Sequence, residues 1–171
     1  MTGTAPPRLL SQIRGLRVLT TDGQPAGRLN DLTVRLGPAH PLVDRLLVRR
    51  GRIAFLVDWD DVAEVATSHV SLKRGARLQR TATSSPGLRH DEILLVRDVL
   101  DTQVVNLSGH GLARVADVLI LDRGDGLAGP EQDAALAEEI TGKEQADIAV
   151  TEPDEVVGNP AVVWLGLVVF W

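Results

Sequence analysis

An internal repeat constrains the fold of this chain more than any other feature. Residues 17–34 align without a gap on residues 103–120, at an offset of 86 residues. Four aligned positions are identical, and they pair Val18 with Val104, Gly23 with Gly109, Arg28 with Arg114 and Asp31 with Asp117. Recurrence at a fixed offset is typical of chains built from repeated structural units. We therefore expect two related units.

Each copy of the repeat predicts a β-hairpin. A short β-branched run leads to a turn that contains glycine, and a longer strand follows. In the first copy Leu32, Val34 and Leu36 alternate with Thr33 and Arg35, which is the period of a half-buried strand. Further strands are expected at residues 42–48 and 53–57, joined through Gly51, which suits a tight turn.

The next segment changes character. Asp58 is placed to cap a short helix over residues 58–65, with carboxylates in its first turn. Residues 69–72 then predict a closing strand. Short strands with tight turns and one helical turn favour a small β-barrel, which removes sheet edges by closure.

These patterns divide the chain into parts. We expect a first barrel at residues 11–74, a polar linker at 75–90 and a second unit at 91–171 with an acidic insertion at 122–160. Residues 91–100 are densely apolar and are interpreted as a short helix or an irregular strand. The next apolar strand of the second unit is expected at residues 162–169.

Charge is distributed unevenly. Residues 1–121 contain 16 Lys and Arg against 12 Asp and Glu, whereas residues 122–160 contain 11 acidic residues and only Arg123 and Lys143 as basic ones. We expect this acidic segment to be mobile or loosely docked, with a helix at residues 130–141. Its natural docking partner is the arginine-rich face of the first barrel.

The last 11 residues, 161–171, carry no charge. That length is too short to span a membrane, which takes about 20 residues. An uncovered apolar strand would be an aggregation hazard, so we expect it to pack against the hairpin at 104–121. The residual edge favours a homodimer. The first seven residues show no targeting pattern and the chain lacks cysteine, which suits a cytoplasmic location.

The residues of the first unit resemble a PRC-barrel domain over positions 13–74. The resemblance rests on Val18-Leu19, Asp22-Gly23, Gly27 to Leu32, Leu46 to Val48, Phe55 to Val57, Trp59 and Val62 to Val65. The second copy, residues 91–120, resembles the tandem PRC-type repeat of bacterial proteins that carry magnesium-transporter intracellular and nucleotide-sensing CBS modules. It departs from that pattern because no second hairpin directly follows its long strand. The fold class implied is mainly β, with a small PRC-type barrel plus a second, incomplete PRC-like unit.

Catalytic and metal candidates have simpler structural interpretations. Asp58, Asp60 and Asp61 could bind a cation, but capping a helix explains them as well. The histidines, which are His40, His69, His90 and His110, lack metal-ligand spacing. Asp31 and Asp117 could form a paired acid site, but are expected to bind backbone amides locally. Ser108 has no nucleophile elbow, and the glycines at 109–111 and 124–126 lack phosphate-loop spacing. We expect no catalytic residue, cofactor or metal.

A basic set is the remaining candidate for binding, comprising Arg45, Arg49, Arg50, Arg52, Lys73, Arg74, Arg77 and Arg80. A solvated charged face is the simpler interpretation of most of it. The four arginines at 45–52 are the candidate partner-binding residues. The resemblance implies a non-enzymatic, cytoplasmic regulatory or adaptor module associated with a magnesium-transporter-type protein, binding a protein or other domains of a larger protein. The alternative is a ribosome-maturation-type adaptor that binds a ribosomal protein or structured RNA through the hairpin at 45–52. RNA is the less favoured partner, because the chain is acidic overall and poor in aromatics. A third class, a hydrolase, would need an acid/base or nucleophile pair that the sequence does not display.

Overall fold

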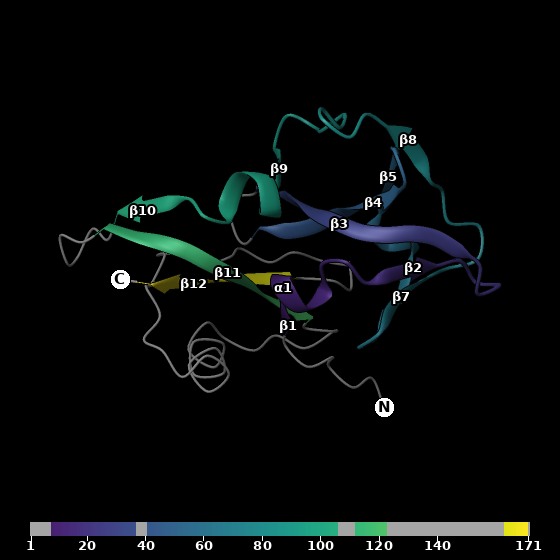
Figure 1. The fold of residues 1–171 in the computed structure, drawn as a ribbon, viewed down its shortest axis with the longest axis horizontal. Coiled ribbons are helices and arrows are strands. Elements are labelled where there is room, and N and C mark those ends of the chain that lie inside the picture. The colour runs from purple at the N-terminus through teal and green to yellow at the C-terminus, as the bar shows by residue number, and fades with distance from the viewer. Residues whose placement is uncertain (1–7, 37–40, 106–111, 123–162, 171) are drawn as a thin grey trace, which may run out of the picture. The chain divides into compact units, whose positions relative to one another are not determined.

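The strands of the described residues fall into two mainly β units. The computed structural model describes residues 8–36, 41–105, 112–122 and 163–170. Unit 1 comprises residues 1–11, 36–42 and 98–171, and unit 2 comprises residues 12–35 and 43–97. Figure 1 shows the strands of both units along the chain.

Unit 2 is built on one eight-stranded sheet. Its strand order is β6-β7-β2-β3-β4-β5-β8, with β9 paired to β3. The strands are β2 (Arg17–Leu19), β3 (Pro25–Arg35), β4 (Leu42–Arg50), β5 (Ile53–Asp58), β6 (Val62–Val65), β7 (His69–Leu72), β8 (Gln79–Thr81) and β9 (Glu92–Leu94). Within the described residues the path ends at β6 and β8, so the pairing that would close the expected barrel is not among those observed.

Both hairpins predicted for the first copy are confirmed. β2 pairs antiparallel with β3, and β4 pairs antiparallel with β5. The pairing of Arg50 with Ile53 leaves Gly51 and Arg52 as the turn, and Gly51 has a φ of 62°. That left-handed conformation is the one that glycine adopts without a steric penalty.

The helix predicted over residues 58–65 is mostly wrong. Only Trp59–Asp61 are helical, as one turn of 3₁₀-helix, and Val62–Val65 form strand β6. Asp58 occupies the N-cap position, but its side chain makes no capping hydrogen bond. β6 forms because its backbone pairs antiparallel with β7, and tertiary pairing outweighs the local signal of three clustered carboxylates.

The segment predicted as a linker contributes to the sheet of unit 2. Strand β8 lies inside residues 75–90 and pairs with β5. The region at 91–100 contains both expected forms in succession, since strand β9 is followed by one turn of π-helix at Leu95–Val99. The predicted boundaries at residues 74 and 91 therefore do not coincide with those of the two units.

The core of unit 2 is aliphatic. Its fully buried side chains come from β2, β3, β4, β5 and β7, and they are Val18, Leu32, Val34, Leu46, Val48, Ala54, Val57 and Val70. Burying each valine or leucine contributes roughly 1.5–3 kcal/mol relative to exposure. These strands therefore form a well-anchored platform for the side chains at their ends.

Unit 1 is built around one long strand. β11 (Leu112–Asp122) pairs antiparallel with β1 (Arg8–Leu9), β10 (Gln103–Val105) and β12 (Val163–Phe170). Helix α1 (Leu10–Ile13) follows β1 directly. The pairing of β12 with β11 confirms that the apolar C-terminal segment packs against the second hairpin (Figure 1).

Other predictions for the second copy are not tested. Asp122, the first residue of the acidic segment, is the last residue of β11. The rest of that segment lies outside the described residues, so the expected helix at 130–141 and the docking on the first barrel stay predictions. The homodimer stays a prediction. Among the described helices, none is long and apolar enough to cross a membrane.

Candidate functional site

The turn of the β4–β5 hairpin presents three of the four predicted partner-binding arginines to solvent. Arg49, Arg50 and Arg52 are all exposed. The Arg50 guanidinium carbon lies 5.4 Å from the centroid of the Phe55 ring, a cation–π distance. Arg49 Nε donates a hydrogen bond to the Gly51 carbonyl at 2.9 Å. These contacts orient Arg49 and Arg50 on the paired strands β4 and β5. That the arginines bind a partner stays a prediction.

Arg45 is different, and the expectation that it belongs to this exposed set is wrong. It is only 4% exposed. Its Nε donates to Glu92 Oε1 at 2.7 Å, and its Nη2 donates to Glu92 Oε2 and to the Gly87 carbonyl. A buried guanidinium needs such a partner, because an unpaired buried charge is costly. Arg45 therefore fastens the segment from Gly87 to Glu92 to β4.

The charges of this buried pair support each other. Burial raises the pKa of Glu92, but hydrogen bonds from Arg45, the Arg89 backbone and Thr33 outweigh it, so the pKa lies below the usual value. The hydrogen bond to Glu92 raises the pKa of Arg45, against the opposing effect of burial. Both groups are thus held in their charged forms.

An exposed rim of charges surrounds the pair. Asp44 contacts both Arg35 and Arg89, whose side chains are each 47% exposed. Asp58 lies 3.9 Å from Arg89, and Asp58 Oδ1 is buried without a hydrogen-bond partner. The long Arg89 side chain thus carries positive charge to two carboxylates on neighbouring strands.

The three carboxylates at residues 58–61 do not converge. Asp61 Oδ2 accepts the backbone N–H of Arg77 at 2.9 Å, so it stabilises the loop after β7. In the part of the chain that the structure describes, no three potential metal-ligating side chains form a cluster. His69 Nδ1 lies 3.1 Å from the hydroxyl of Ser68, while His40 and His110 lie outside the described residues.

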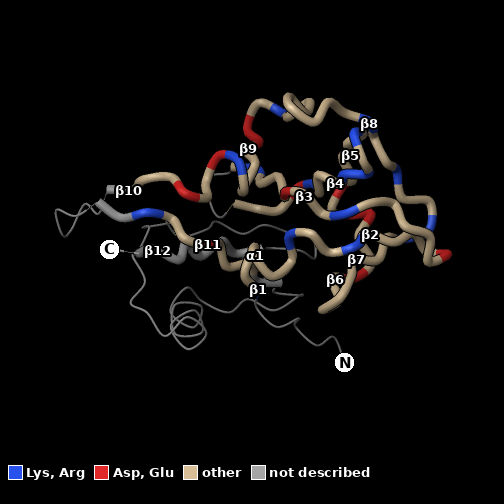
Figure 2. Tube along the Cα trace, viewed as in Figure 1, with Lys and Arg blue, Asp and Glu red and all other residues tan. Residues whose placement is uncertain are grey.

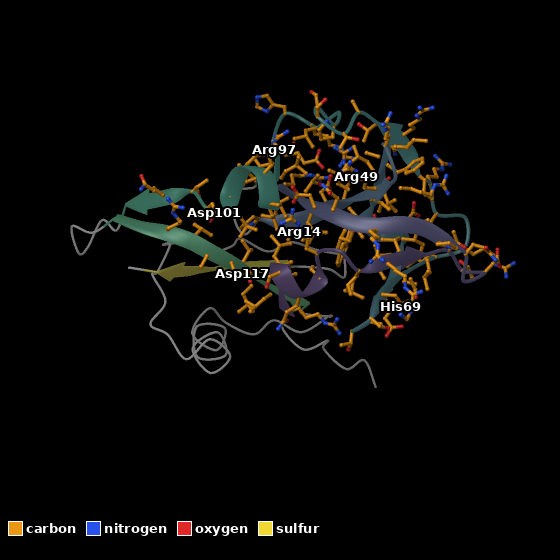
Figure 3. The ribbon with its side chains drawn as sticks, in the orientation of Figure 1. Arg14, Arg49, His69, Arg97, Asp101 and Asp117 are labelled. Carbon is orange, nitrogen blue, oxygen red and sulfur yellow. The ribbon has the colours of Figure 1, made fainter. Side chains whose placement is uncertain are left out.

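Each of the repeated aspartates binds a local backbone amide, as the sequence predicted, and also binds amides that are distant in sequence. Asp31 Oδ1 accepts the N–H groups of Leu32 and Val96, both at 2.8 Å, and Oδ2 accepts the N–H of Arg97 at 3.2 Å. Asp117 Oδ1 accepts the N–H groups of Val118 at 2.8 Å and Ser11 at 3.1 Å, close to an irregularity in β11 (Figure 3).

Other candidates fall elsewhere. Lys73 and Arg74 line a cavity of about 200 Å³ with Thr20, Thr21 and Asp22, away from the hairpin turn in sequence. Ser108 and the glycine clusters at 109–111 and 124–126 lie outside the described residues. Lysines and arginines lie on several segments of unit 2 rather than on one element (Figure 2).

Sequence reasoning missed a second cavity, of about 310 Å³, that is lined by Arg14, Arg28 and Arg49. These arginines come from the segment after α1, from β3 and from β4 respectively; Arg14 and Arg49 are labelled in Figure 3. The sequence had singled out Arg28, through its identity with Arg114 in the repeat, and Arg49, as a candidate partner-binding residue, but not Arg14. Their convergence depends on strand pairing, which no local pattern reports.

No family model matches the chain, and no curated protein matches it either.

Proposed function

We propose that this protein is a non-enzymatic regulatory or adaptor module of the PRC-barrel type, which binds a protein partner through the turn of its β4–β5 hairpin. The observation that carries the proposal is the exposure of Arg49 and Arg50 at the end of β4 and of Arg52 in the turn that follows. Within the described residues none of the three contacts a carboxylate, so their charge is available to an acidic partner surface. By the resemblance, the partner is a magnesium-transporter-type protein or another domain of a larger cytoplasmic protein.

The arrangement of the two units supports the tandem-repeat part of the proposal. In unit 2, β3 pairs with β2 near its start and with β9 near its end. In unit 1, β11 pairs in the same way with β10 and with β1. Each unit thus combines the hairpin of one repeat with the short lead-in strand that precedes the other repeat.

The conserved geometry of the aspartates agrees with this exchange. Asp31 accepts amides at Val96 and Arg97, and Asp117 accepts the amide at Ser11. The offset of 86 residues that aligns Asp31 with Asp117 also aligns Ser11 with Arg97. We infer that both units are copies of one PRC-type element with exchanged lead-ins.

Crosslinking in cells of the source organism tests the binding proposal. The wild-type chain is compared with a hairpin variant that carries Arg49→Glu, Arg50→Glu and Arg52→Glu. The matched control carries Lys73→Glu, Arg74→Glu and Arg77→Glu, which is the same change of charge at exposed residues outside the hairpin. We expect one protein to crosslink to the wild type and the control but not to the hairpin variant. An identical set of crosslinks for all three chains would contradict the proposal.

The same exposed arginines favour one rival, a ribosome-maturation-type adaptor that binds structured RNA or a ribosomal protein. Binding to the RNA backbone releases counterions. The logarithm of the binding constant therefore falls steeply and linearly with the logarithm of the salt concentration. Tight RNA binding by the purified chain with such a slope, lost in the hairpin variant, would favour the rival.

A further inference from the structure

Three arginines converge on one cavity of unit 2. Arg14, Arg28 and Arg49 line it together with Gly15, Leu29, Asn30 and Gly51, and no acidic residue takes part. Its volume of about 310 Å³ is at the lower end of the range for small-molecule sites, which is roughly 300–1,000 Å³. The lining therefore carries positive charge, and the cavity is sized for a small ligand.

Close approach of two strands brings the arginines together. A Cβ atom on Gly27 would lie 2.7 Å from the Arg49 carbonyl oxygen and 2.8 Å from Val48 Cγ1. Only glycine fits at position 27, because a real Cβ atom does not come this close to other heavy atoms. Gly27 directly precedes Arg28 on β3, so the absence of a side chain there places Arg28 beside Arg49 on β4.

Backbone carbonyls hold two of the guanidinium groups. Arg28 Nη1 donates to the Gly15 carbonyl, and Arg49 Nε donates to the Gly51 carbonyl, each at 2.9 Å. The Gly15 N–H in turn donates to the Leu29 carbonyl at 2.8 Å, which fixes the loop that carries Arg14 against β3. Arg28 and Arg49 are thus positioned by the backbone before any ligand binds.

The positive charge of the cavity is not neutralised by the described residues. Among them, no carboxylate forms an ion pair with Arg14, Arg28 or Arg49. The two carbonyl contacts use one N–H donor of Arg28 and one of Arg49. A guanidinium has five N–H donors in a planar fork that matches oxyanions. Most donors of the cluster remain for a ligand with several acceptor oxygens.

We propose that this cavity is a binding site for a phosphate group, as inorganic phosphate or as a small phosphomonoester. A carboxylate is satisfied by one bidentate arginine, whereas a phosphate presents more oxygens and close to two negative charges at neutral pH. No aromatic side chain lines the cavity, so base stacking does not contribute. The site shares Arg49 with the proposed partner surface, whereas Arg14 and Arg28 lie outside that surface.

Titration of the ¹⁵N-labelled full chain with inorganic phosphate, followed by NMR at constant ionic strength, tests the proposal. We expect saturable shifts at the backbone amides of Gly15 and Gly51 and at the Arg28 side chain. Loss of a charge-assisted hydrogen bond weakens binding by about tenfold or more, so Arg14→Gln and Arg28→Gln should each have that effect. Arg52→Gln, an exposed arginine outside the cavity lining, is the matched control and should change the affinity by less than twofold.

Further ligands separate the sources of the anion. Phosphorylserine should compete with inorganic phosphate, and acetate at the same ionic strength should not. Unsaturable shifts, or equal weakening by Arg52→Gln and Arg28→Gln, would show diffuse charge attraction and overturn the proposal. Binding of an RNA oligonucleotide without binding of free phosphate would overturn it as well. Because Arg14 and Arg28 lie outside the hairpin turn, failure here leaves the proposed function intact.

Discussion

Replacing Glu92 with glutamine should destabilise unit 2 strongly, although it preserves the size of the side chain. Glu92 is 5% exposed and accepts two hydrogen bonds from Arg45 and one from the Arg89 N–H at 2.8 Å. The amide removes the negative charge and leaves the buried Arg45 guanidinium with a more distant carboxylate, Asp44, whose Oδ2 lies 3.9 Å from Arg45 Nε. The substitution therefore acts on one ion pair rather than on packing.

The expected loss is large compared with an ordinary surface change. One hydrogen bond to a charged group contributes about 1.5–3 kcal/mol. Removing one partner of a buried ion pair costs about 3–5 kcal/mol, because the remaining charge is unpaired. Asp91→Asn is the matched control, since Asp91 is 44% exposed and lies 4.0 Å from Arg35. Such an exposed pair contributes about 0–1 kcal/mol.

Urea denaturation, followed by tryptophan fluorescence, measures both losses. Trp59 lies in unit 2 and reports on that unit. The double variant Arg45→Met with Glu92→Gln should lose less than the sum of the single variants, with a coupling of about 0.5–3 kcal/mol. A Glu92→Gln loss no larger than that of Asp91→Asn would refute the role given to this pair.

The pH dependence has a definite sign. The pKa of Glu92 in the folded chain lies below the ordinary value of 4.5, so its charged form stabilises the fold. That contribution is complete above pH 4.5 and is lost as the pH falls through the folded pKa. The stability difference between wild type and Glu92→Gln should therefore be constant near neutral pH and shrink in acid. A difference that grows in acid would contradict this assignment.

Three further predictions concern backbone contacts and assembly. Gly27→Ala should lower the free energy of unfolding by about 1–3 kcal/mol, because the new Cβ would overlap the Arg49 carbonyl. Gly23→Ala is the control, since Gly23 has a positive φ but a Cβ there would meet no atom within 4 Å. In denaturation experiments Asp31→Ala should cost more than Asp117→Ala, since Asp31 accepts three backbone amides and Asp117 two. Light scattering at high protein concentration should give the molar mass of a homodimer. The molar mass of a monomer would contradict that prediction.

Sequence patterns identified the strands that depend on local periodicity. The alternation in β3 and the glycine turn before β5 are short-range signals, and both hairpins follow them. The apolar run that became β12 was also correctly assigned to β11, because an uncovered strand of that composition needs a partner. Residues 62–65 were misassigned because the carboxylates before them indicate a helix start, while the pairing with β7 decides the outcome.

Long-range contacts set the limit of prediction at the candidate site. Arg45 looked like its exposed neighbours at 49–52, and the carboxylate that makes its burial possible is 47 residues away at Glu92. The same limit applies to the cavity lined by Arg14, Arg28 and Arg49, where strand pairing and the close approach at Gly27 bring Arg28 to Arg49. Neither contact leaves a motif in the sequence, since strand pairing over such separations is set by the whole sheet.

The affinity of this chain for its purified crosslinked partner tests the adaptor function most directly. Isothermal titration calorimetry would compare the wild type with Arg50→Gln/Arg52→Gln and with the control Lys73→Gln/Arg74→Gln, which removes two charges from another surface of unit 2. We predict that the hairpin substitutions raise the dissociation constant at least tenfold, while the control changes it by less than twofold. Equal affinity for all three chains would contradict binding through the β4–β5 turn.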